Sequence, residues 1–544
     1  MAIDTPVSPA PAVRTQVFSR KATGLVRQAG GRDVFIYNVN FINIAIGLAF
    51  IFLFIPAGSY PGSNIYLAII FTVIAVMPTT LVYAMFASAM PRSGGEYVYV
   101  SRTISPMWGL VANWNYTMWS FFYIGVPAAF LGKYGISSLM RAIGVYSHNL
   151  SLVNVGTFFA SPLGTFLAGA ALICIFAAIF IRGLHAYMKV QNFLFGIALL
   201  SLVAIVLICL TANPSTFASH FNTYMFPVTG HTNTLALISG ILGSGAPHAT
   251  GFNIHDTIAS LTWPFSVLGF GIASAYIGGE VKGANRAQIR GMTGSVLFSA
   301  IWMLGLTAVV LRIIPYNTLG SIGAVSPATS GMGFTPVFTE IVSMMTSNWF
   351  LLILVGVGFC LWTYTWLPIY IITTTRNMLA WAFDGLLPSR VADVHEDLHS
   401  PIIAILISST LGLGFLAVYA FTPNFATVSG FFGQVIGTYM IASVAAILFP
   451  FRMRDVFESS PVRWRVGGLP LISILGVLSL LGMGLISWSY LNDPNSGISL
   501  AHPTMIWINV GVFLSGFVFY FAAKTVRRLQ GVDLSLTFAE IPPE

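Results

Sequence analysis

Charged residues are scarce in this sequence. Asp, Glu, Lys and Arg make up 7% of the 544 residues, whereas apolar residues make up 56%. Soluble globular chains carry about 25% charged residues, so the composition excludes a soluble globular protein and predicts a polytopic protein of the lipid bilayer. The formal net charge of +8 then indicates basic loops on one side of a membrane, and not a surface that binds nucleic acid.

Cysteine and catalytic motifs are scarce as well. The three cysteines, Cys174, Cys209 and Cys360, lie in apolar stretches without a CxxC or metal-ligand spacing, which is typical of small buried side chains. The sequence has neither a GxSxG pattern nor a GxxxxGKS or GxxxxGKT phosphate loop. We therefore expect no enzyme, no ATP-driven pump, and no cofactor or metal site.

Long apolar runs, in contrast, are abundant. A run of about 20 apolar residues crosses a bilayer, and the sequence predicts twelve such spans. They fall near residues 34–57, 65–90, 104–131, 163–183, 186–211, 258–281, 293–315, 348–374, 401–421, 425–449, 468–489 and 503–523. With the N-terminus inside, only Lys133, Arg141 and Arg312 of the 24 Lys and Arg residues fall outside. Since basic residues favour inner loops, we expect a multi-pass protein of the cell membrane with both termini in the cytoplasm.

These spans divide the chain into six parts. We expect a disordered cytoplasmic tail over 1–32, spans 1–5 as a first repeat over 33–211, an extracellular loop over 212–257, spans 6–10 as a second repeat over 258–450, spans 11 and 12 over 451–523, and a cytoplasmic tail over 524–544.

The sixth span is interrupted by glycine. Gly269, Gly271 and Gly278 follow an apolar start at Trp263. Glycine weakens a helix by about 1 kcal/mol relative to alanine, and backbone groups in lipid must stay hydrogen-bonded. A break is therefore tolerable only against protein or a watery cavity, and such breaks carry substrate sites in secondary transporters. Close packing of an unbroken helix through small residues is the alternative.

The first span is irregular too. Asn38, Asn40 and Asn43 interrupt it and are followed by Gly47. Interrupted helices in matching positions of two halves indicate a site near mid-membrane, where half-helix N-termini offer N–H groups to a carboxylate and carbonyl ends face an ammonium. Hydrogen bonding between helices is the alternative reading of the asparagines.

Ionisable residues are almost absent from the spans. Glu280 lies at the inner end of the sixth span, and Asp33 and Glu96 lie at inner boundaries. This argues against a cation channel lined by acidic rings. A neutral or zwitterionic solute fits such a membrane core better.

Three motifs follow spans 2, 6 and 8. They are MPRSGGEYVYVSR (Met90 to Arg102), GGEVKGANRAQIRG (Gly278 to Gly291) and TRNMLAWAFDGLLPSRVADVH (Thr375 to His395), with Ser400-Pro401 opening span 9. With these motifs in this order, the sequence resembles the amino acid–polyamine–organocation (APC) superfamily, that is, the amino acid permeases. The likeness covers roughly residues 30–450.

The resemblance implies an all-α integral membrane protein with twelve transmembrane helices, a leucine-transporter-like fold with two inverted five-helix repeats, broken helices 1 and 6, and alternating access. It implies that the substrate carboxylate meets N–H groups near Gly47 to Ala49, that the ammonium meets carbonyls near Leu268 to Phe270, and that Phe265 and Phe270 gate the substrate. With the two breaks included, the expected substrate-binding residues are Asn43, Gly47, Leu48, Ala49, Phe265, Leu268, Gly269, Phe270 and Gly271.

The sequence departs from the family at three positions. Ala49 replaces the last glycine of the usual Gly-Ser-Gly, Ile272 replaces a glutamate after the break in span 6, and Ala198 stands where some proton-coupled members have a lysine. A proton route would then use Glu280, whereas Thr363 and Thr365 lie near the family's second sodium site.

We therefore favour sodium slightly over the proton as the coupling ion. Thr363 and Thr365 bonded within their own helix, or uniport or exchange without any ion, are the alternatives. The expected function is secondary active transport of amino acids, with neutral ones favoured. A related small amine or carboxylate as substrate, or a receptor or scaffold that does not transport, is the alternative. No pattern indicates the oligomeric state.

Overall fold

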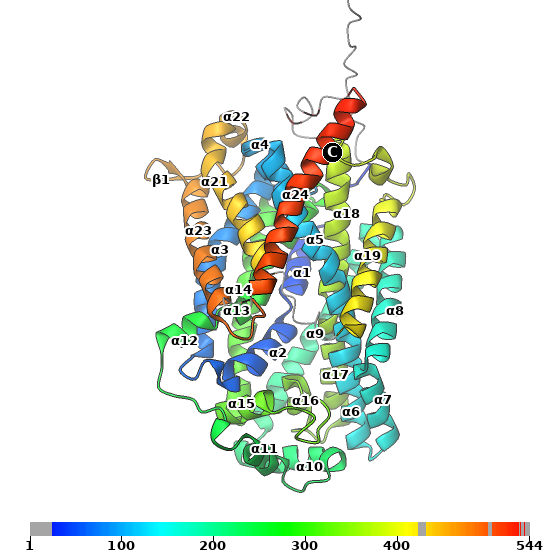
Figure 1. The fold of residues 1–544 in the computed structure, drawn as a ribbon, viewed down its shortest axis with the longest axis vertical. Coiled ribbons are helices and arrows are strands. Elements are labelled where there is room, and N and C mark those ends of the chain that lie inside the picture. Colours follow the sequence, from blue (N-terminus) through cyan, green and yellow to red (C-terminus); the bar gives the residue numbers. More distant parts are fainter. Residues whose placement is uncertain (1–23, 423–430, 499–502, 532–533, 535–537, 539–544) are drawn as a thin grey trace, which may run out of the picture.

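A computed structural model describes residues 24–422, 431–498, 503–531, 534 and 538, and most of them are helical (Figure 1). Residues 1–23 of the expected N-terminal tail and residues 425–430 of the expected tenth span lie outside the described residues. Helix α1 begins at Gly31 and so includes the last two residues of that tail.

The first half of the chain forms nine helices within the described residues. They are α1 (Gly31–Ile42), α2 (Ile44–Phe54), α3 (Ile65–Ala89), α4 (Glu96–Thr103), α5 (Pro106–Phe130), α6 (Ser137–Tyr146), α7 (Leu150–Ala160), α8 (Pro162–Ile181) and α9 (Leu184–Thr211). Two π-helical turns, Ile55–Ser59 and Leu131–Ile136, extend α2 and α5.

The expected loop 212–257 contains three short helices, and the second half follows it. These segments are α10 (Phe217–Thr229), α11 (Thr234–Leu242), α12 (Ile254–Ala259), α13 (Thr262–Leu268), α14 (Ala284–Ile313), α15 (Tyr316–Ala324), α16 (Phe338–Ser343), α17 (Trp349–Thr363), α18 (Trp366–Phe383), α19 (Ile402–Phe421), α20 (Phe431–Gln434) and α21 (Met440–Arg452). A π-helical turn, Val435–Tyr439, joins α20 to α21.

The remaining described elements are α22 (Arg454–Ser459), the antiparallel strands β1 (Arg465–Val466) and β2 (Leu469–Pro470), α23 (Leu471–Asn492) and α24 (Pro503–Leu529). In the hairpin Arg465 pairs with Pro470 and Val466 pairs with Leu469.

Side-chain caps begin several of the long helices. Ser105 and Ser161 accept hydrogen bonds from N–H groups in the first turns of α5 and α8, and a proline follows each serine. Proline suits the first helical position because the N–H that it lacks has no partner there. These serine–proline sequences therefore determine where α5 and α8 begin.

Ten segments of the described chain are long and apolar enough to cross a membrane. Two expected spans are not among them. Helix α5 is 25 residues long but carries buried Asn113, Asn115 and Thr117, and the span expected near 258–281 is broken after Leu268. The protein is thus a multi-pass all-helical membrane protein.

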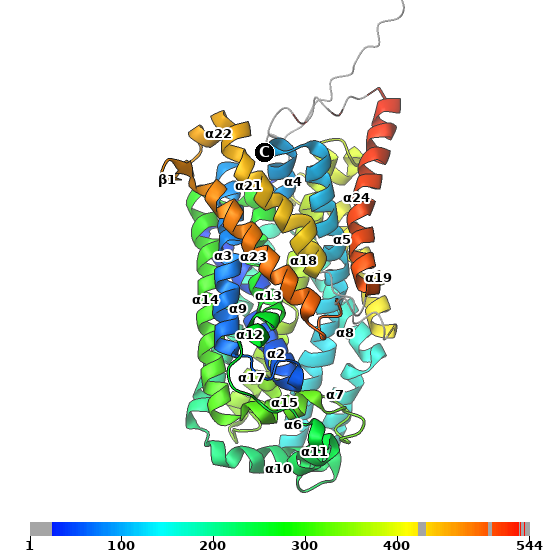
Figure 2. The same cartoon turned by 60° about the vertical axis from the view of Figure 1, so that its left-hand side comes forward.

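The helices form an upright bundle with α5 deep inside it. Helix α5 packs against α18 and α19, α14 packs against α1 and α3, and α9 packs against α17. Helix α24 stands at the margin, where it contacts α5 (Figure 2). The buried core therefore lies around the two interrupted spans rather than at α24.

The bundle has two distinct ends (Figure 1). One end carries α4, α22 and the end of α24, and we call it the terminal face. The other carries α10, α11 and α15, and we call it the loop face.

Candidate functional site

The first span is broken at Asn43. This residue separates α1 from α2 and has a φ of 60°, a left-handed conformation that asparagine tolerates better than most residues. Its Oδ1 accepts from the N–H of Ile46 at 3.3 Å, and its Nδ2 donates to the carbonyl of Trp362 at 2.9 Å. Asn43 therefore caps α2 and ties the break to α17.

Gly47, Leu48 and Ala49 lie inside α2, one turn beyond this break. The N–H of Gly47 donates to the carbonyl of Asn43 at 3.0 Å, so this donor already has a partner. A Cβ on Gly47 would lie 2.6 Å from a methyl carbon of Val267 in α13. In this structure Gly47 thus allows the two interrupted spans to pack closely.

The first turn of α2 follows directly from the break. N–H groups in a first turn have no partner within their own helix, and here the Asn43 side chain takes only that of Ile46. The N–H groups of Ile44 and Ala45 are therefore the nearest donors for an anion, a few residues before the expected ones.

The sixth span is broken after Leu268, where α13 ends. The chain continues through turns and two 3-10 segments, Ala273–Tyr276 and Gly278–Glu280, until α14 begins at Ala284. The N–H groups of Gly269 and Phe270 still donate to the carbonyls of Phe265 and Val267 at 3.0 and 3.1 Å. Beyond them the helical bonds stop, so the carbonyls at the break have no partner further along a helix. This is the position at which the sequence predicts an ammonium site.

Two glycines fit the backbone of this break into the bundle. The carbonyl of Gly269 accepts a hydrogen bond from the Tyr439 hydroxyl at 3.2 Å. A Cβ on Gly271 would clash with Val296 of α14. Tyr439 therefore contacts the break itself, and Gly271 leaves room for α14.

A polar network joins the two interrupted spans on the side of their breaks that faces the terminal face. Asn38 Nδ2 donates to Ser274 Oγ at 2.9 Å, and the N–H of Ser274 donates to Asn38 Oδ1 at 3.2 Å. Ser274 Oγ donates to Gln288 Oε1 at 2.6 Å, and Gln288 Nε2 donates back to the Ser274 carbonyl at 2.9 Å. Asn38 of α1 thus forms hydrogen bonds with the sixth span, which is the alternative reading of the asparagines given by the sequence analysis.

An aromatic cluster surrounds Phe270. Its ring centroid lies 4.9 Å from that of Phe41, 5.5 Å from Phe431, 6.1 Å from Trp366 and 6.4 Å from Tyr370. Trp366 Nε1 also donates to the carbonyl of Phe41 at 2.6 Å. Beside the polar backbone of the breaks, the side-chain environment is therefore apolar.

Phe265 lies apart from this cluster. Its ring meets Tyr490 of α23 edge-on at 6.0 Å, and a Cβ on Gly269 would lie 2.8 Å from its ring. The two phenylalanines expected to gate the substrate thus have different neighbours, and only Phe270 contacts α1 and α18.

The terminal face is closed by a buried ion pair. Arg376 Nε and Nη2 donate to Glu280 Oε1 and Oε2 at 2.7 and 2.9 Å. The carbonyl of Glu280 accepts from the N–H groups of Gln28 and Ala29 at 2.9 and 3.0 Å. Glu280, expected as a coupling group, here joins α18, the sixth span and the N-terminal segment.

The SGGEY motif packs on the same region. Ser93 forms an isolated antiparallel bridge with Ile277, and the N–H of Gly94 donates to the carbonyl of Tyr276 at 3.1 Å. Gly95 has a φ of +55°, and a Cβ there would lie 2.6 Å from the Tyr276 ring. Glycine is required here because its neighbours leave no room for a side chain.

The threonines expected at a sodium site bond within their own chain segment. Thr363 Oγ1 donates to the carbonyl of Cys360 at 2.7 Å, and Thr365 Oγ1 donates to that of Trp362 at 3.2 Å. This is the local bonding that the sequence left open as an alternative.

A small cavity lies beside Thr365. It has a volume of about 20 Å³, and Asn40, Gln191 and Ala198 also line it. In the described part of the chain, Asn40 Oδ1 and Gln191 Oε1 are buried without a hydrogen-bond partner. The cavity has room for one water-sized group.

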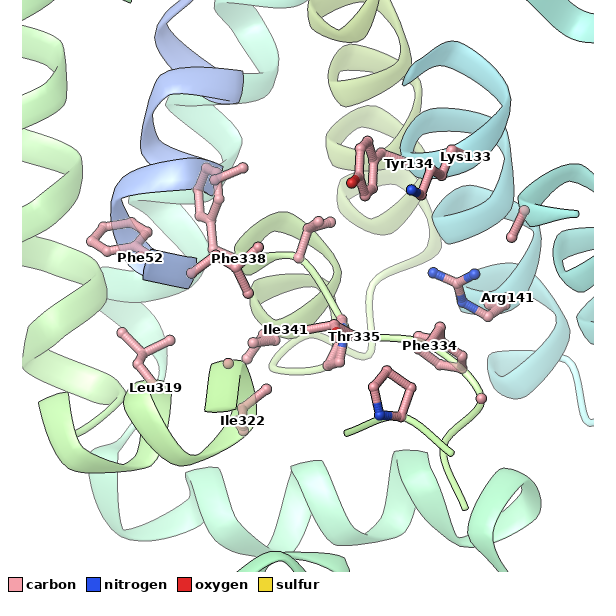
Figure 3. A pocket seen from close by; sticks show the side chains of 18 residues that line it. Phe52, Lys133, Tyr134, Arg141, Leu319, Ile322, Phe334, Thr335, Phe338 and Ile341 are labelled. Atoms are coloured by element: carbon pink, nitrogen blue, oxygen red, sulfur yellow. The ribbon is translucent and has the colours of Figure 1, made fainter. Parts of the chain in front are cut away.

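A larger pocket of about 350 Å³ opens near the loop face (Figure 3). Phe52, Phe338 and Ile341 line one part of it, and Lys133 and Arg141 line another. Ala49 in α2 also borders it. The pocket therefore reaches the interrupted first span.

One of the two cations in this pocket is neutralised. Arg141 Nε and Nη2 donate to Glu340 Oε1 and Oε2 at 3.0 and 2.9 Å, and the guanidinium carbon lies 3.7 Å from the centroid of the Phe334 ring. Within the described residues, Lys133 has no such carboxylate partner within 4.0 Å. Its ammonium instead lies 5.5 and 5.9 Å from the ring centroids of Tyr134 and Tyr419.

The segment between α18 and α19 contains a HExxH pattern formed by His395, Glu396 and His399. This pattern binds zinc when a helix places both histidines on one face. Here it lies in turns, and His395 Nδ1 instead accepts from the N–H groups of Asp397 and Leu398. The described residues hold no group of three or more His, Cys, Asp or Glu that could bind a metal.

Arg376, Trp366 and Tyr439 contribute to the site but were not expected there. Arg376 belongs to a recognised motif, but the eighth span was expected to end at residue 374, whereas α18 continues to Phe383 and buries the arginine. Trp366 and Tyr439 carry no sequence signal, because aromatic residues make up 14% of the chain.

Two interrupted spans whose breaks meet in a multi-pass bundle are typical of secondary transporters. The chain belongs to the amino acid permease family, whose model matches residues 38–515. It is therefore a membrane transporter of amino acids and not an enzyme.

Relatives match along most of their length. The chain is similar to a branched-chain amino acid permease of Lactococcus lactis subsp. cremoris (strain MG1363), with 21% identity over 87% of this chain and 89% of the relative. It is 22% identical to a branched-chain amino acid permease of Bacillus subtilis (strain 168), over 90% and 92%. It is also 22% identical to an uncharacterized transporter of Mycobacterium tuberculosis (strain ATCC 25618 / H37Rv), over 80% and 84%.

Proposed function

We propose that this protein moves neutral amino acids with branched apolar side chains across the cell membrane by alternating access. The observation that carries the proposal is the combination of polar backbone at the two breaks with the aromatic cluster around Phe270. The polar backbone can bind the charged groups of a zwitterion, and the aromatic cluster can bind its apolar side chain. The relatives named as branched-chain amino acid permeases support the same substrate class.

The substrate's charged groups would meet backbone. The first turn of α2 would receive the carboxylate through N–H groups of Ile44 and Ala45, where the helix dipole favours negative charge. Carbonyls near Leu268 and Phe270 would receive the ammonium. The larger expected set, including Gly47, Leu48, Ala49 and Gly271, stays a prediction.

The twelve-span fold with inverted repeats and cytoplasmic termini also belongs to this proposal. The arginine and lysine distribution supports it, because the terminal face is the basic one. With this orientation, the pocket beside Lys133 opens outside and the Arg376–Glu280 pair closes the inside. Such a conformation would admit substrate from outside.

Sodium coupling through Thr363 and Thr365 stays a prediction. The two unpaired oxygens of Asn40 and Gln191 beside Thr365 offer support, because sodium binds several neutral oxygens. The Thr365 hydroxyl already donates to the Trp362 carbonyl. A role of Glu280 in ion coupling likewise stays a prediction.

The proposal is tested by uptake of labelled leucine into proteoliposomes that contain the full chain. Isoleucine and valine in excess should compete. The leucine analogues 3-methylbutylamine, which lacks the carboxylate, and 4-methylpentanoate, which lacks the ammonium, should not, because a site that bonds a polar group rejects analogues without it. Competition by either analogue alone would favour an amine or carboxylate as substrate. Absence of transport for every solute tried would favour a receptor or scaffold.

A matched pair of variants tests whether uptake depends on the proposed binding site. Phe270→Trp fills space that the proposed substrate side chain would occupy, and a loss of about 1.4 kcal/mol of binding free energy lowers affinity about tenfold. Phe350→Trp makes the same change at a side chain that is 71% exposed. Uptake should fall about tenfold in the first variant and stay unchanged in the second.

A further inference from the structure

Five carboxylic side chains are buried in the described part of the chain: Glu96, Glu280, Glu340, Asp384 and Asp493. Three of them pair with a buried arginine, Glu280 with Arg376, Glu340 with Arg141 and Asp384 with Arg102. Glu96 and Asp493 have no such partner in the described residues. A buried carboxylate without a cation is unfavourable in its charged form, so these two need another explanation.

Asp493 is explained by its loop. It follows α23 directly, and its Oδ1 accepts from the N–H of Asn495 at 2.8 Å, while its Oδ2 is buried without a hydrogen-bond partner in the described residues. This is a local turn that asparagine would make equally well.

Glu96 lies in α4, outside the ten candidate spans, and is fully buried. Asn113 Nδ2 donates to its Oε1 at 2.8 Å, and the Tyr83 hydroxyl donates to its Oε2 at 3.4 Å. Burial raises the pKa of the Glu96 carboxyl to about 7, while Asn113, Tyr276 and Tyr83 oppose the rise. Burial without a cation therefore favours the protonated carboxyl, and exposure to water would favour the ionised one.

Other ionisable groups around Glu96 leave this charge uncompensated. On α4, Arg102 pairs with Asp384 of the α18 end, and Tyr97 donates to the same carboxylate at 2.7 Å. On α18, Arg376 pairs with Glu280. Within the described residues, the other ionisable groups that the hydrogen bonds and ring contacts around Glu96 connect are phenols: Tyr83 on α3, Tyr99 on α4, Tyr116 on α5, Tyr276 in the broken span and Tyr439 before α21.

Two tyrosines connect Glu96 to the substrate break. The Tyr83 ring lies 5.7 Å from that of Tyr439, whose hydroxyl donates to the Gly269 carbonyl. Tyr276, beside Glu96, belongs to the unwound part of the sixth span itself. A change of charge at Glu96 thus acts on the segment that must move when the terminal face opens.

We propose that Glu96 is a proton-binding site that couples amino acid movement to a proton gradient. This proposal rests on the proposed function and adds a co-substrate to it. With the terminal face closed and the loop face open, a proton from outside reaches Glu96 through the break beside Tyr439 and Tyr276, and the dry site holds the protonated carboxyl. When that face opens, water reaches the carboxylate, favours its ionised form and releases the proton to the cytoplasm.

The test uses proteoliposomes with the full chain in sodium-free choline buffer and labelled leucine as the probe. Two assays run in parallel: exchange against unlabelled leucine at equal pH on both sides, and accumulation driven by an interior one pH unit more alkaline. Coupling to one proton supports about tenfold accumulation per pH unit, and a protonophore should abolish it. Glu96→Gln should retain exchange but lose accumulation, and Glu96→Asp should recover part of it.

Asp493→Asn is the matched control. It removes the other buried unpaired carboxylate, whose pKa burial raises to about 6, and should leave accumulation as in the wild type. Tyr83→Phe removes a hydrogen bond that favours the charged form of Glu96. The pH midpoint of exchange should therefore move upward in this variant relative to the wild type, and it should disappear in Glu96→Gln.

The assays separate the two proposals. Wild-type exchange without pH-driven accumulation, or accumulation by Glu96→Gln equal to the wild type, contradicts the proton site and leaves amino acid transport standing. Accumulation that requires sodium also contradicts it. Absence of leucine exchange by the wild type contradicts the proposed function, and the proton site with it. If Glu96→Gln does not fold, an unmoved pH midpoint in Tyr83→Phe decides against the proposal.

Discussion

Single residues fix where the interrupted spans break. Asn43 takes the left-handed backbone and caps α2 with its own side chain, so the break falls there and not at the glycine four residues later. Gly47 and Gly271 lie beside side chains of other helices, Val267 and Val296. Both positions therefore need glycine because an added Cβ would overlap a side chain of a neighbouring helix.

This view predicts the result of adding one methyl group. Gly47→Ala should lower the free energy of unfolding by about 1–3 kcal/mol, because the new Cβ overlaps Val267. Combining it with Val267→Ala should recover about 0.5–3 kcal/mol relative to the sum of the single changes. Thermal unfolding of the purified full chain measures both.

The control is Gly414→Ala in α19, where an added Cβ meets nothing within 4 Å. Its unfolding temperature should equal or exceed that of the wild type, because alanine stabilises a helix by about 1 kcal/mol relative to glycine. Strictly additive effects of Gly47→Ala and Val267→Ala would show that Gly47 is needed for something other than packing, such as binding substrate at its backbone.

At the scale of elements, each face is held by contacts between segments distant in sequence. The terminal face is closed where α18, the broken sixth span and the SGGEY motif meet. The loop face is covered by α10, α11 and α15, with the pocket beside Lys133 near it. The proposed orientation assigns these elements to opposite sides of the membrane.

Thiol labelling tests that assignment. In a background with Cys174, Cys209 and Cys360 replaced by alanine, Ser244→Cys after α11 and Ser389→Cys after α18 each place one cysteine at an exposed position. An impermeant reagent added to right-side-out vesicles should label only the first. Labelling of Ser389→Cys from outside, with Ser244→Cys protected, would reverse the orientation.

The interrupted spans were predictable from the sequence, and several of their contacts were not. Glycine and asparagine in apolar runs signal a break because they weaken a helix. Which side chain meets which carbonyl depends on helices that pack from far along the chain, as Trp362 does on Asn43. The pairing of Glu280 with Arg376 was hidden for the same reason, and because α18 extends past the expected end of its span.

At the scale of the whole molecule, the two ends of the bundle differ in what lies between them and the breaks. The buried pair Arg376–Glu280 seals the terminal face, and a pocket of about 350 Å³ reaches Ala49 from the loop face. The two breaks lie between these ends, with Phe270 and its aromatic neighbours around them. The proposed alternating access would require the Arg376–Glu280 pair to separate while the pocket beside Lys133 closes.

The most direct test of this account is the position of a bound amino acid, determined by electron cryo-microscopy of the full chain with leucine. The account predicts density between the first turn of α2 and the end of α13, with the carboxylate at Ile44 and Ala45 and the side chain against Phe270. Leucine found only in the pocket beside Lys133, with the breaks empty, would contradict it.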